Sequence, residues 1–413
     1  MARLARLIDA PRRWYRRLGQ WRGARGSRGA HATVPFWRDI RVLAIVAQLV
    51  VLGFVLLAGY LIWTTLARNM ADARLSVGFD FLRATAGFDI SQTIIPYTPR
   101  SSYGTAFLAG LLNTLMVSAL GIVLATILGI IVGVARLSRN WLVTRIATGY
   151  VELMRNTPLL VQLVLIYAVF LQLPTVANSI GLPGSVFLNQ RGLVMPRPLT
   201  EPGFGLWLGI VVLGVVLAFA GSRFSTYRLE RAKPTYGIGR LSLLAMLVLP
   251  VLAWGLLQPV AFDVPEQQRF NFVGGVVISP PFAALLLGLV IYTAAFIGEV
   301  VRGGIQAVRR GQLEAAQSIG LTPGQTLQLI VFPQALRIIV PPLTSQYLNL
   351  TKNSSLAIAV GFPDLFAISR TMANQTGAPV SVIVLVMSTY LTISLVTSLL
   401  MNIYNRRVQV LER

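Results

Sequence analysis

The sequence predicts an all-α polytopic membrane protein with about eight transmembrane helices. Of its 413 residues, 55% are hydrophobic and only 12% are charged. The mean hydropathy of +0.68 is well above that of a water-soluble domain, and apolar runs that approach or exceed the length needed to cross a bilayer recur along the chain. This composition excludes a soluble enzyme.

The chain begins with a basic segment, residues 1–39, which we predict to be a cytoplasmic tail. Eleven arginines fall within residues 1–41, and basic residues collect in the cytoplasmic segments of multi-spanning proteins. Anionic membrane lipid is therefore the expected partner of the tail, rather than nucleic acid. The apolar run over residues 40–66 is longer than the roughly 7 to 15 residues of a signal-peptide core, so we expect a retained span.

Further apolar runs follow at intervals that fit a multi-spanning chain. About 20 helical residues, at 1.5 Å per residue, cross a hydrocarbon core of about 30 Å. The eight predicted spans are 40–66, 105–135, 158–173, 205–221, 241–259, 282–301, 338–360 and 380–403. The segments between them hold the glycine, proline and charged residues expected of loops and helix ends.

Positive charges set the predicted orientation. With the N-terminus inside, the tail, the alternate loops and residues 404–413 hold 27 of the 36 Lys and Arg, whereas the opposite loops hold 8. Lys and Arg are enriched on the cytoplasmic side of membrane proteins. Both termini are therefore predicted to be cytoplasmic, and the long loops 67–104 and 174–204 to face outward.

The inner loop 302–337 has a composition unlike that of an ordinary turn. Apolar residues recur at three-residue steps, which predicts a short amphipathic helix over residues 312–319: Leu313, Ala316 and Ile319. Gly320 is a natural stop for that helix, and Thr322 followed by Pro323 is typical of a helix start. The loop is predicted to be a helix-turn-helix on the cytoplasmic side.

The sequence leaves two kinds of partner possible for this helix-turn-helix, a protein or the lipid surface. It is either a rigid projection to which another protein binds or an interfacial helix that lies on the lipid surface. The small residues Ala315, Ala316 and Gly320 favour the protein partner, because close backbone approach needs small side chains. Lipid binding would instead prefer Lys, Arg, Trp and Phe.

The same loop resembles the EAA loop, EAA-x3-G-x9-I-x2-P, of the type I ABC importer permeases. Six positions reproduce it at fixed spacing: Glu314, Ala315, Ala316, Gly320, Ile330 and Pro333. Other stretches resemble the polar amino acid branch of that family (histidine, glutamine and general L-amino acids), such as ELMRNTPLLVQLVLIYAVF from Glu152 and GEVVRGGI from Gly298. The chain is most similar to the larger permease subunit of a general L-amino acid ABC transporter.

The resemblance implies a type I importer transmembrane domain over residues 105–403. Its core spans would be 105–135, 158–173, 282–301, 338–360 and 380–403. Compared with the usual five-span pattern, residues 40–104 add a first span and a periplasmic loop, and a helix pair within 205–259 is inserted. We expect these additions to be peripheral helices that stabilise the complex or its lipid contacts.

The resemblance also implies a function and partners. In the family, two permease subunits form one pathway, a cytoplasmic ABC ATPase dimer docks on the EAA helices, and a periplasmic binding protein delivers an amino acid. By this resemblance, the ATPase-coupling residues are Glu314, Ala315, Ala316 and Gly320. The chain is expected to be a non-enzymatic permease subunit for polar or general L-amino acids in the inner membrane, in a heterodimer with a similar permease.

The sequence independently predicts that any ATP is bound by another chain. A phosphate-binding P-loop needs Gly-Lys followed by Ser or Thr, and the two lysines, Lys233 and Lys352, follow Ala232 and Thr351. The chain has no cysteine, and its one histidine, His31, lies in the polar tail. We therefore expect no metal and no cofactor.

Two other classes are alternatives. An ion-coupled secondary amino acid transporter needs carboxylates inside the membrane, but Glu299 lies at the end of a span and Asp364 is predicted in an outer loop. A membrane enzyme needs His, Cys or paired carboxylates that face one another. The sequence shows no such constellation.

Polar residues near the end of one span are candidates for the substrate pathway. Lys352 follows Arg337 by about 15 residues, roughly 22 Å along a helix, which leaves it short of the outer edge. It either snorkels to that edge or lines the pathway with its neighbours Thr351, Asn353 and Ser354, a stretch that is similar to one in the family. Two prolines ahead of it, Pro341 and Pro342, should kink or break the helix.

Two acid–base pairs near predicted cytoplasmic helix ends are expected to be local ion pairs. Glu152 precedes Arg155, and Glu299 precedes Arg302, by three residues. A proton relay is the less favoured alternative. The stretch 156–158, Asn-Thr-Pro, is expected to end one helix and start the next, with Asn or Thr as the cap.

Overall fold

The computed structural model describes residues 40–72, 78–230 and 238–409, and it divides into two compact units, residues 1–76 and 77–413. In the first unit, α3 (Ile40–Asp72) is a continuous helix of 33 residues. Its stretch Val42–Thr65 is long and apolar enough to cross a membrane. The predicted first span is therefore a helix, whereas the predicted basic tail lies outside the described residues.

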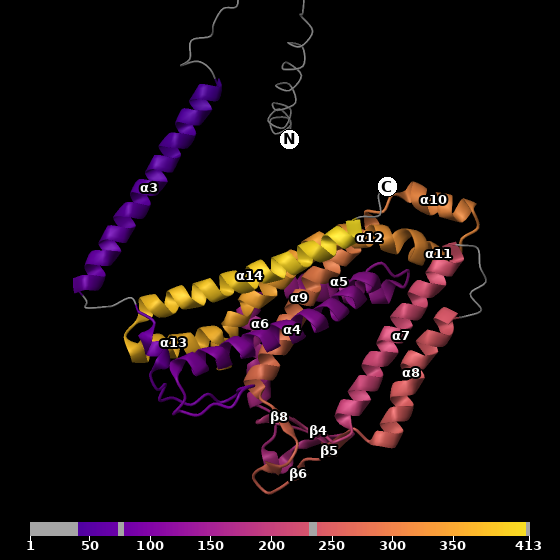
Figure 1. Ribbon diagram of the computed structural model, residues 1–413, viewed down its shortest axis with the longest axis horizontal. Helices are drawn as coiled ribbons and strands as arrows, with labels where there is room; N and C mark the ends of the chain where they lie inside the picture. The colour runs from indigo at the N-terminus through magenta and orange to yellow at the C-terminus, as the bar shows by residue number, and fades with distance from the viewer. Residues whose placement is uncertain (1–39, 73–77, 231–237, 410–413) are drawn as a thin grey trace, which may run out of the picture. The chain divides into compact units, whose positions relative to one another are not determined.

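The second unit is built around α4 (Tyr103–Ala135) and α9 (Pro280–Gln306), which pack along one another near its middle (Figure 1). Their backbones approach closely at Gly133, where an added Cβ would lie 2.8 Å from the carbonyl oxygen of Gly298. Side chains from four helices fill the main core of the unit, including Val117, Leu163, Leu289 and Leu350. Two of the predicted core spans are thus the central helices of the unit.

The predicted span 158–173 is one arm of a bent helix pair. α5 (Trp141–Asn156) and α6 (Leu159–Leu171) are bent by 107° with respect to one another. α5 lies in a stretch that the charge count assigned to an inner loop, and Asn140 caps it by accepting a hydrogen bond of 2.9 Å from the backbone N–H of Leu142. With 13 residues, α6 by itself is short for a span.

The bend between these helices is held by a glutamine. The Nε2 of Gln162 donates to the carbonyl oxygens of Met154 and Thr157, each at 3.0 Å. Pro158 occupies the N-cap position of α6 without a side-chain cap. The stretch 156–158 ends one helix and starts the next as expected, but the expected cap from Asn156 or Thr157 is wrong, because Asn156 still belongs to α5 and Pro158 itself occupies the N-cap position of α6.

The segments between α6 and α9 that were expected to be outer loops fold into short antiparallel strands. A four-stranded sheet has the order β1, β2, β3, β8, and two ribbons pair β4 with β5 and β6 with β7. The strands are β1 (Ile180–Leu182), β2 (Val186–Asn189), β3 (Gly192–Met195), β4 (Arg197–Thr200), β5 (Val260–Asp263), β6 (Glu266–Gln267), β7 (Phe272–Val273) and β8 (Val276–Ile278). The predicted helical membrane fold class is confirmed, and these short strands are a small addition to it.

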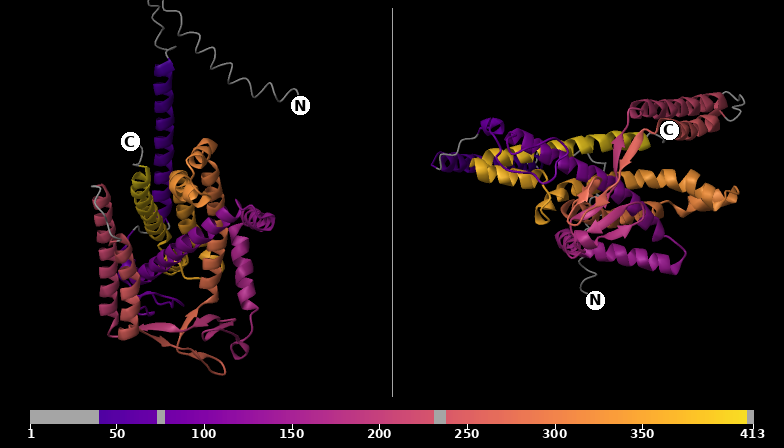
Figure 2. Two further views of the ribbon diagram at one scale, coloured as in Figure 1. Left: turned by 90° about the vertical axis from the view of Figure 1, so that its right-hand side faces the viewer. Right: turned by 90° about the horizontal axis from the view of Figure 1, so that it is seen from below.

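The inserted helix pair consists of α7 (Phe204–Glu230) and α8 (Ile238–Leu257), which lie side by side (Figures 1 and 2). The rings of Trp207 and Trp254 form a T-shaped pair with centroids 5.3 Å apart, and Nε1 of Trp207 donates to the carbonyl of Pro250 at 3.0 Å. The β4–β5 ribbon joins the two ends of the hairpin. Residues 231–237 of the predicted basic connection lie outside the described residues.

The C-terminal part of the unit is a series of helices joined by short turns. Its elements are α10 (Arg310–Ser318), α11 (Pro323–Thr326), the π turn η4 (Leu327–Val331), α12 (Phe332–Asn353), the 3-10 turn η5 (Ser354–Ala359), α13 (Leu365–Thr376) and α14 (Pro379–Gln409). α11, η4 and α12 form one uninterrupted helical run, so the predicted span 338–360 begins earlier than expected. The helix also continues through Pro341 and Pro342, so of the two outcomes expected of these prolines, a kink or a break, the break does not occur. Membrane helices tolerate internal proline where neighbouring groups bond the freed carbonyls.

The number of spans differs from the eight predicted. Six described helices are long and apolar enough to cross a membrane, or seven if the α5–α6 pair counts as one broken span. The described apolar stretch of α8 has 14 residues, Leu244–Leu257, and is short for a span. The count of eight is therefore not confirmed.

Candidate functional site

The loop that carries the EAA pattern is a helix-turn-helix with a defined cap on each side of its turn. After α10, Gly320 adopts the left-handed conformation with φ of +79°, which favours glycine. The N–H of Gly320 bonds the carbonyl of Gln317, and the N–H of Leu321 bonds that of Ala316, each at 3.0 Å. These two bonds form a Schellman motif, so the predicted helix stop at Gly320 is confirmed.

The second helix of this loop restarts as its sequence predicts. Thr322 is the N-cap of α11, and its side chain and that of Gln325 form a reciprocal capping box. Pro323 occupies the first turn of the helix. α10 itself begins at Arg310, two residues before the predicted start.

The two faces of α10 differ in exposure. Leu313 packs against the main core and Ala316 is buried, which anchors the helix. Glu314, Ala315 and Gly320 are exposed, and the side chain of Ile319, expected on the anchoring stripe, is 75% exposed. The exposed face is a free surface with small side chains and one apolar residue.

A cavity of about 520 Å³ lies beneath this helix-turn-helix. Its lining includes Arg139, Ile305, Gln317 and Leu327. The loop therefore rests on the unit over an incompletely filled space. Figures 1 and 2 show α10 and α11 at the opposite end of the second unit from the strands.

A carboxylate near the end of α9 joins three elements. Glu299 forms ion pairs with Arg136, at the end of α4, and with Arg302. Arg155 of α5 lies 3.9 Å from Glu299, and its guanidinium stacks over the ring of Phe296 at 5.3 Å. The predicted Glu299–Arg302 pair is confirmed, whereas the predicted Glu152–Arg155 pair is wrong because Arg155 turns to Glu299.

The four candidate pathway residues do not share one face. Thr351 and Ser354 are buried, and their hydroxyls donate to the carbonyls of Tyr347 at 3.0 Å and of Thr351 at 2.7 Å. Asn353 is half-buried, and Lys352 is exposed. Consecutive residues of a helix are about 100° apart around its axis, so they cannot all face one path.

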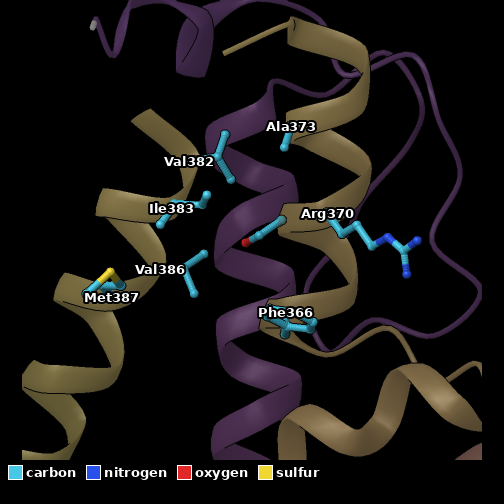
Figure 3. Close-up of a pocket in the computed structure, with 8 residues that line it drawn as sticks. Phe366, Arg370, Ala373, Val382, Ile383, Val386 and Met387 are labelled. Atoms are coloured by element: carbon cyan, nitrogen blue, oxygen red, sulfur yellow. The ribbon is translucent and has the colours of Figure 1, made fainter. Parts of the chain in front are cut away.

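Lys352 lines a cavity of about 390 Å³ together with Ser355, Phe366 and Tyr390. A second cavity, of about 320 Å³, lies between α13 and α14. Figure 3 shows its apolar wall, with Val382, Ile383, Val386 and Met387 on α14 facing Phe366 and Ala373 on α13. Three residues belong to both cavities: Phe366, Val386 and Met387.

The turn that leads into α13 is fixed by polar side chains of α4. Asn113 donates to the carbonyl of Pro363 at 2.8 Å, and Thr114 accepts from the N–H of Leu365 at 2.9 Å. Asp364 is fully buried and caps α13 by accepting from the N–H of Ala367. Asp364 thus lies in the turn before α13, as expected of a loop residue, and its side chain is a buried cap there.

Several of these residues could not be identified from the sequence. Arg136 and Tyr390 were not singled out, because each acts through a residue far away in the chain. Arg370, on the rim of the α13–α14 cavity, was counted only as one outer charge. The local signal that could have located it is the helix Leu365–Thr376, which has an N-cap at Asp364 and a glycine stop at Gly377.

Known proteins resemble this chain over most of its length. Residues 125–410 match the family described as "Binding-protein-dependent transport system inner membrane component". The chain is 44% identical over 368 residues to the general L-amino acid transport system permease protein AapQ of Rhizobium johnstonii, covering 88% of this chain and 92% of that protein.

Two further relatives are similar over nearly their whole length. A putative amino-acid ABC transporter permease protein, YhdX of Escherichia coli, is 45% identical over 390 residues, with 93% of this chain and 96% of that protein covered. The glutamate/glutamine/aspartate/asparagine transport system permease protein BztB of Rhodobacter capsulatus is 42% identical over 415 residues, with 91% and 96% covered. The chain therefore belongs to the family of inner membrane components of binding-protein-dependent transport systems, which are multi-pass transport subunits rather than enzymes.

Proposed function

We propose that this chain is a permease subunit of an ATP-driven importer for L-amino acids, and that it forms half of the pathway beside a second permease. The names of the relatives support the amino acid class. The family supports an importer that receives its substrate from a periplasmic binding protein. It does not support the alternative, an ion-coupled secondary transporter.

In this proposal, a separate dimer of ABC ATPases hydrolyses ATP and docks on the EAA loop. The observation that carries the proposal is the exposed face of a rigid, doubly capped helix-turn-helix. Its core anchors are Leu313 and Ala316, and its free residues are Glu314, Ala315 and Gly320. Small exposed side chains permit the close backbone approach that a docked protein needs.

The fold offers a direct route from the docked ATPase to the pathway. The helical run Pro323–Ala359 begins at the turn of the EAA loop and passes Lys352. A displacement of the loop therefore moves the far end of α12 as well, because a continuous helix transmits motion along its axis. We propose that this motion switches the pathway between its two openings.

The proposed orientation places the EAA loop and both termini in the cytoplasm. The excess of Lys and Arg in the tail and the alternate loops supports it. The strands, at the other end of the second unit, then lie on the periplasmic side where the binding protein arrives (Figure 2). The proposal includes a core domain over residues 105–403, with α3 and the α7–α8 hairpin as peripheral additions.

The test is purification of the tagged protein from its native host in mild detergent, followed by mass spectrometry. The wild type is expected to bring down an ATPase and a second permease. Gly320→Arg places a long charged side chain on the docking face, in open space but with a strained φ. We expect it to lose the ATPase and amino acid uptake while the protein stays inserted.

The matched control is Gly303→Arg. Gly303 is exposed in α9, has nothing within 4 Å of an added Cβ, and lies outside the helix-turn-helix. Gly303→Arg adds the same side chain at a position away from the docking face. The variant should therefore retain the ATPase. Normal ATPase binding and uptake by Gly320→Arg would exclude the proposed docking face.

A further inference from the structure

Helix α5 lies across the direction of its neighbour in the chain. It follows α4 after the short turn 136–140, and two residues, Thr157 and Pro158, separate it from α6. The axes of α5 and α6 are bent by 107° with respect to one another (Figure 2). A helix at nearly a right angle to one that crosses the membrane runs along the membrane plane. We therefore expect α5 to lie in that plane.

Contacts with α9 give the depth of α5. Val151 packs in one core cluster with Ala295, and Arg155 lies 3.9 Å from Glu299. Because α9 begins at Pro280, these two contact points lie about 22 and 28 Å along it. A hydrocarbon core is about 30 Å thick. α5 therefore lies close to one boundary of that core, toward the end of α9 from which the EAA loop projects.

This depth also accounts for the shortness of α6. Its 13 residues reach about 20 Å, which is about 10 Å less than the thickness of the core. Interfacial helices bury their apolar face about 5 to 10 Å into the boundary between headgroups and acyl chains. If α5 lies at such a depth, α6 needs to cross only the remaining part of the core.

The side chains of α5 fall into three sectors around its axis, given about 100° per residue. The first sector is buried against the unit and includes Ala147 and Val151. The second is an exposed apolar stripe at successive turns: Leu142, Ile146, Gly149 and Leu153. The third sector is polar and exposed: Arg145, Glu152 and Asn156. Three such sectors suit a helix that has protein, acyl chains and headgroups on three sides.

Arg145 lies at the edge between the polar sector and the apolar stripe, about 60° from Leu142 around the axis. Its side chain is exposed, and the ion pairs in the described part of the chain all involve Glu299 and not Arg145. Glu152 lies two turns further along, about 10 Å away, on the order of a Debye length at physiological salt. Trp141, at the start of the helix, is 70% exposed, and tryptophan is enriched at membrane interfaces.

We propose that α5 is a membrane-surface helix that binds an anionic phospholipid, with the acyl chains along the stripe from Leu142 to Leu153 and the phosphate at Arg145. A guanidinium makes charge-assisted hydrogen bonds to phosphate. A zwitterionic lipid carries a phosphate too, but its own ammonium group offsets the charge, so Arg145 favours the anionic lipid. This inference goes beyond the proposed function and does not depend on it.

A tryptophan placed on the stripe tests the proposal. Ile146 is 65% exposed, so Ile146→Trp puts a fluorescent ring where the acyl chains are expected. The purified importer complex is reconstituted in phosphatidylcholine vesicles that contain brominated phosphatidylcholine or brominated phosphatidylglycerol, since bromine on an acyl chain quenches tryptophan on contact. The chain has 7 tryptophans of its own, so the signal is the difference between Ile146→Trp and the wild type.

We expect brominated phosphatidylglycerol to quench this signal at an about fivefold lower mole fraction than brominated phosphatidylcholine. This is the effect of one basic residue near an anionic surface. Adding Arg145→Gln should abolish the preference and leave quenching by brominated phosphatidylcholine unchanged, because the apolar stripe is intact. Arg145→Lys keeps the charge and should keep the preference. The control is Arg100→Gln, which removes an exposed positive charge from the segment before α4 and should change nothing.

Three results would overturn the proposal. Absence of quenching by either brominated lipid would show that protein, such as the second permease, covers the stripe in the assembled complex. Equal quenching by the two lipids would show that α5 contacts lipid without preferring the anionic class. A preference that survives Arg145→Gln would place the phosphate elsewhere. Amino acid uptake by the same vesicles is measured separately, and its absence with the lipid preference intact counts against the proposed function alone.

Discussion

Glu299 has more partners than its sequence neighbours provide. Arg302 follows it by one helical turn, but Arg136 and Arg155 come from other helices. The carboxylate is 30% exposed, so each bond is partly screened by water. Because three arginines surround this one carboxylate, removing its charge leaves three positive charges close together without a counter-ion.

This arrangement predicts unequal effects of neutralising its members. Glu299→Gln should destabilise the purified protein by about 1 to 3 kcal/mol, because it leaves three arginines without their counter-ion. Arg155→Gln should cost less than about 1 kcal/mol, since Arg155 is 42% exposed and 3.9 Å away. Thermal unfolding in detergent, followed by tryptophan fluorescence, compares the two. Equal losses of stability in the two variants would contradict the conclusion that Glu299 is the centre of this charge cluster.

Helix contacts in this protein depend on small residues at chosen points. Along α4, Gly133 meets α9 so closely that an added Cβ would lie 2.8 Å from both the carbonyl oxygen of Gly298 and the Cβ of Val301. On α5, Gly149 has nothing within 4 Å of the same position. The same residue type therefore has a packing role in one helix and none in the other.

This contrast predicts effects of opposite sign. Gly133→Ala should destabilise the protein by about 1 to 3 kcal/mol, because α4 and α9 must separate. Gly149→Ala should stabilise it by up to about 1 kcal/mol, because alanine is the better helix former and meets open space. The same unfolding assay checks both changes. If both substitutions shift the transition in one direction, the close approach of α4 and α9 is not what limits stability.

At the scale of the whole molecule, the second unit combines a helical core with a separate appendage. Strands β4 and β5 pair in register from Arg197 with Asp263 to Thr200 with Val260. The α7–α8 hairpin begins and ends at the far end of this ribbon. The core cluster shared by α4, α9 and α12 contains none of the described residues of the hairpin, which fits its proposed peripheral role.

A deletion tests that role. Replacing residues 201–259 with Asn-Gly joins Thr200 to Val260, which are already paired, through a two-residue turn. Removing two helices together preserves the orientation of everything that follows. We expect the shortened protein to insert and to retain the ATPase. Loss of the ATPase in a protein that is still inserted would show that the hairpin contributes to the coupled core.

Much of the fold and of the docking loop follows from the sequence because the governing interactions are local. Apolar runs fixed the positions of the long helices by composition alone. The turn at Gly320 and the capping box at Thr322 were predictable, since each bond spans three to five residues. The break at Pro158 was predictable, but the group that holds the bend was not, because Gln162 reaches back from α6 to the carbonyls of Met154 and Thr157.

What the sequence by itself determined is therefore the membrane class, most of the helices and the helix-turn-helix of the EAA loop. Only the tertiary structure decided which polar residues act together. The contact between Arg136 and Glu299 joins residues 163 positions apart, and the cavity beside Lys352 needs α13 and α14 in place. Such contacts depend on how distant helices pack, and one sequence carries no local signal of that packing.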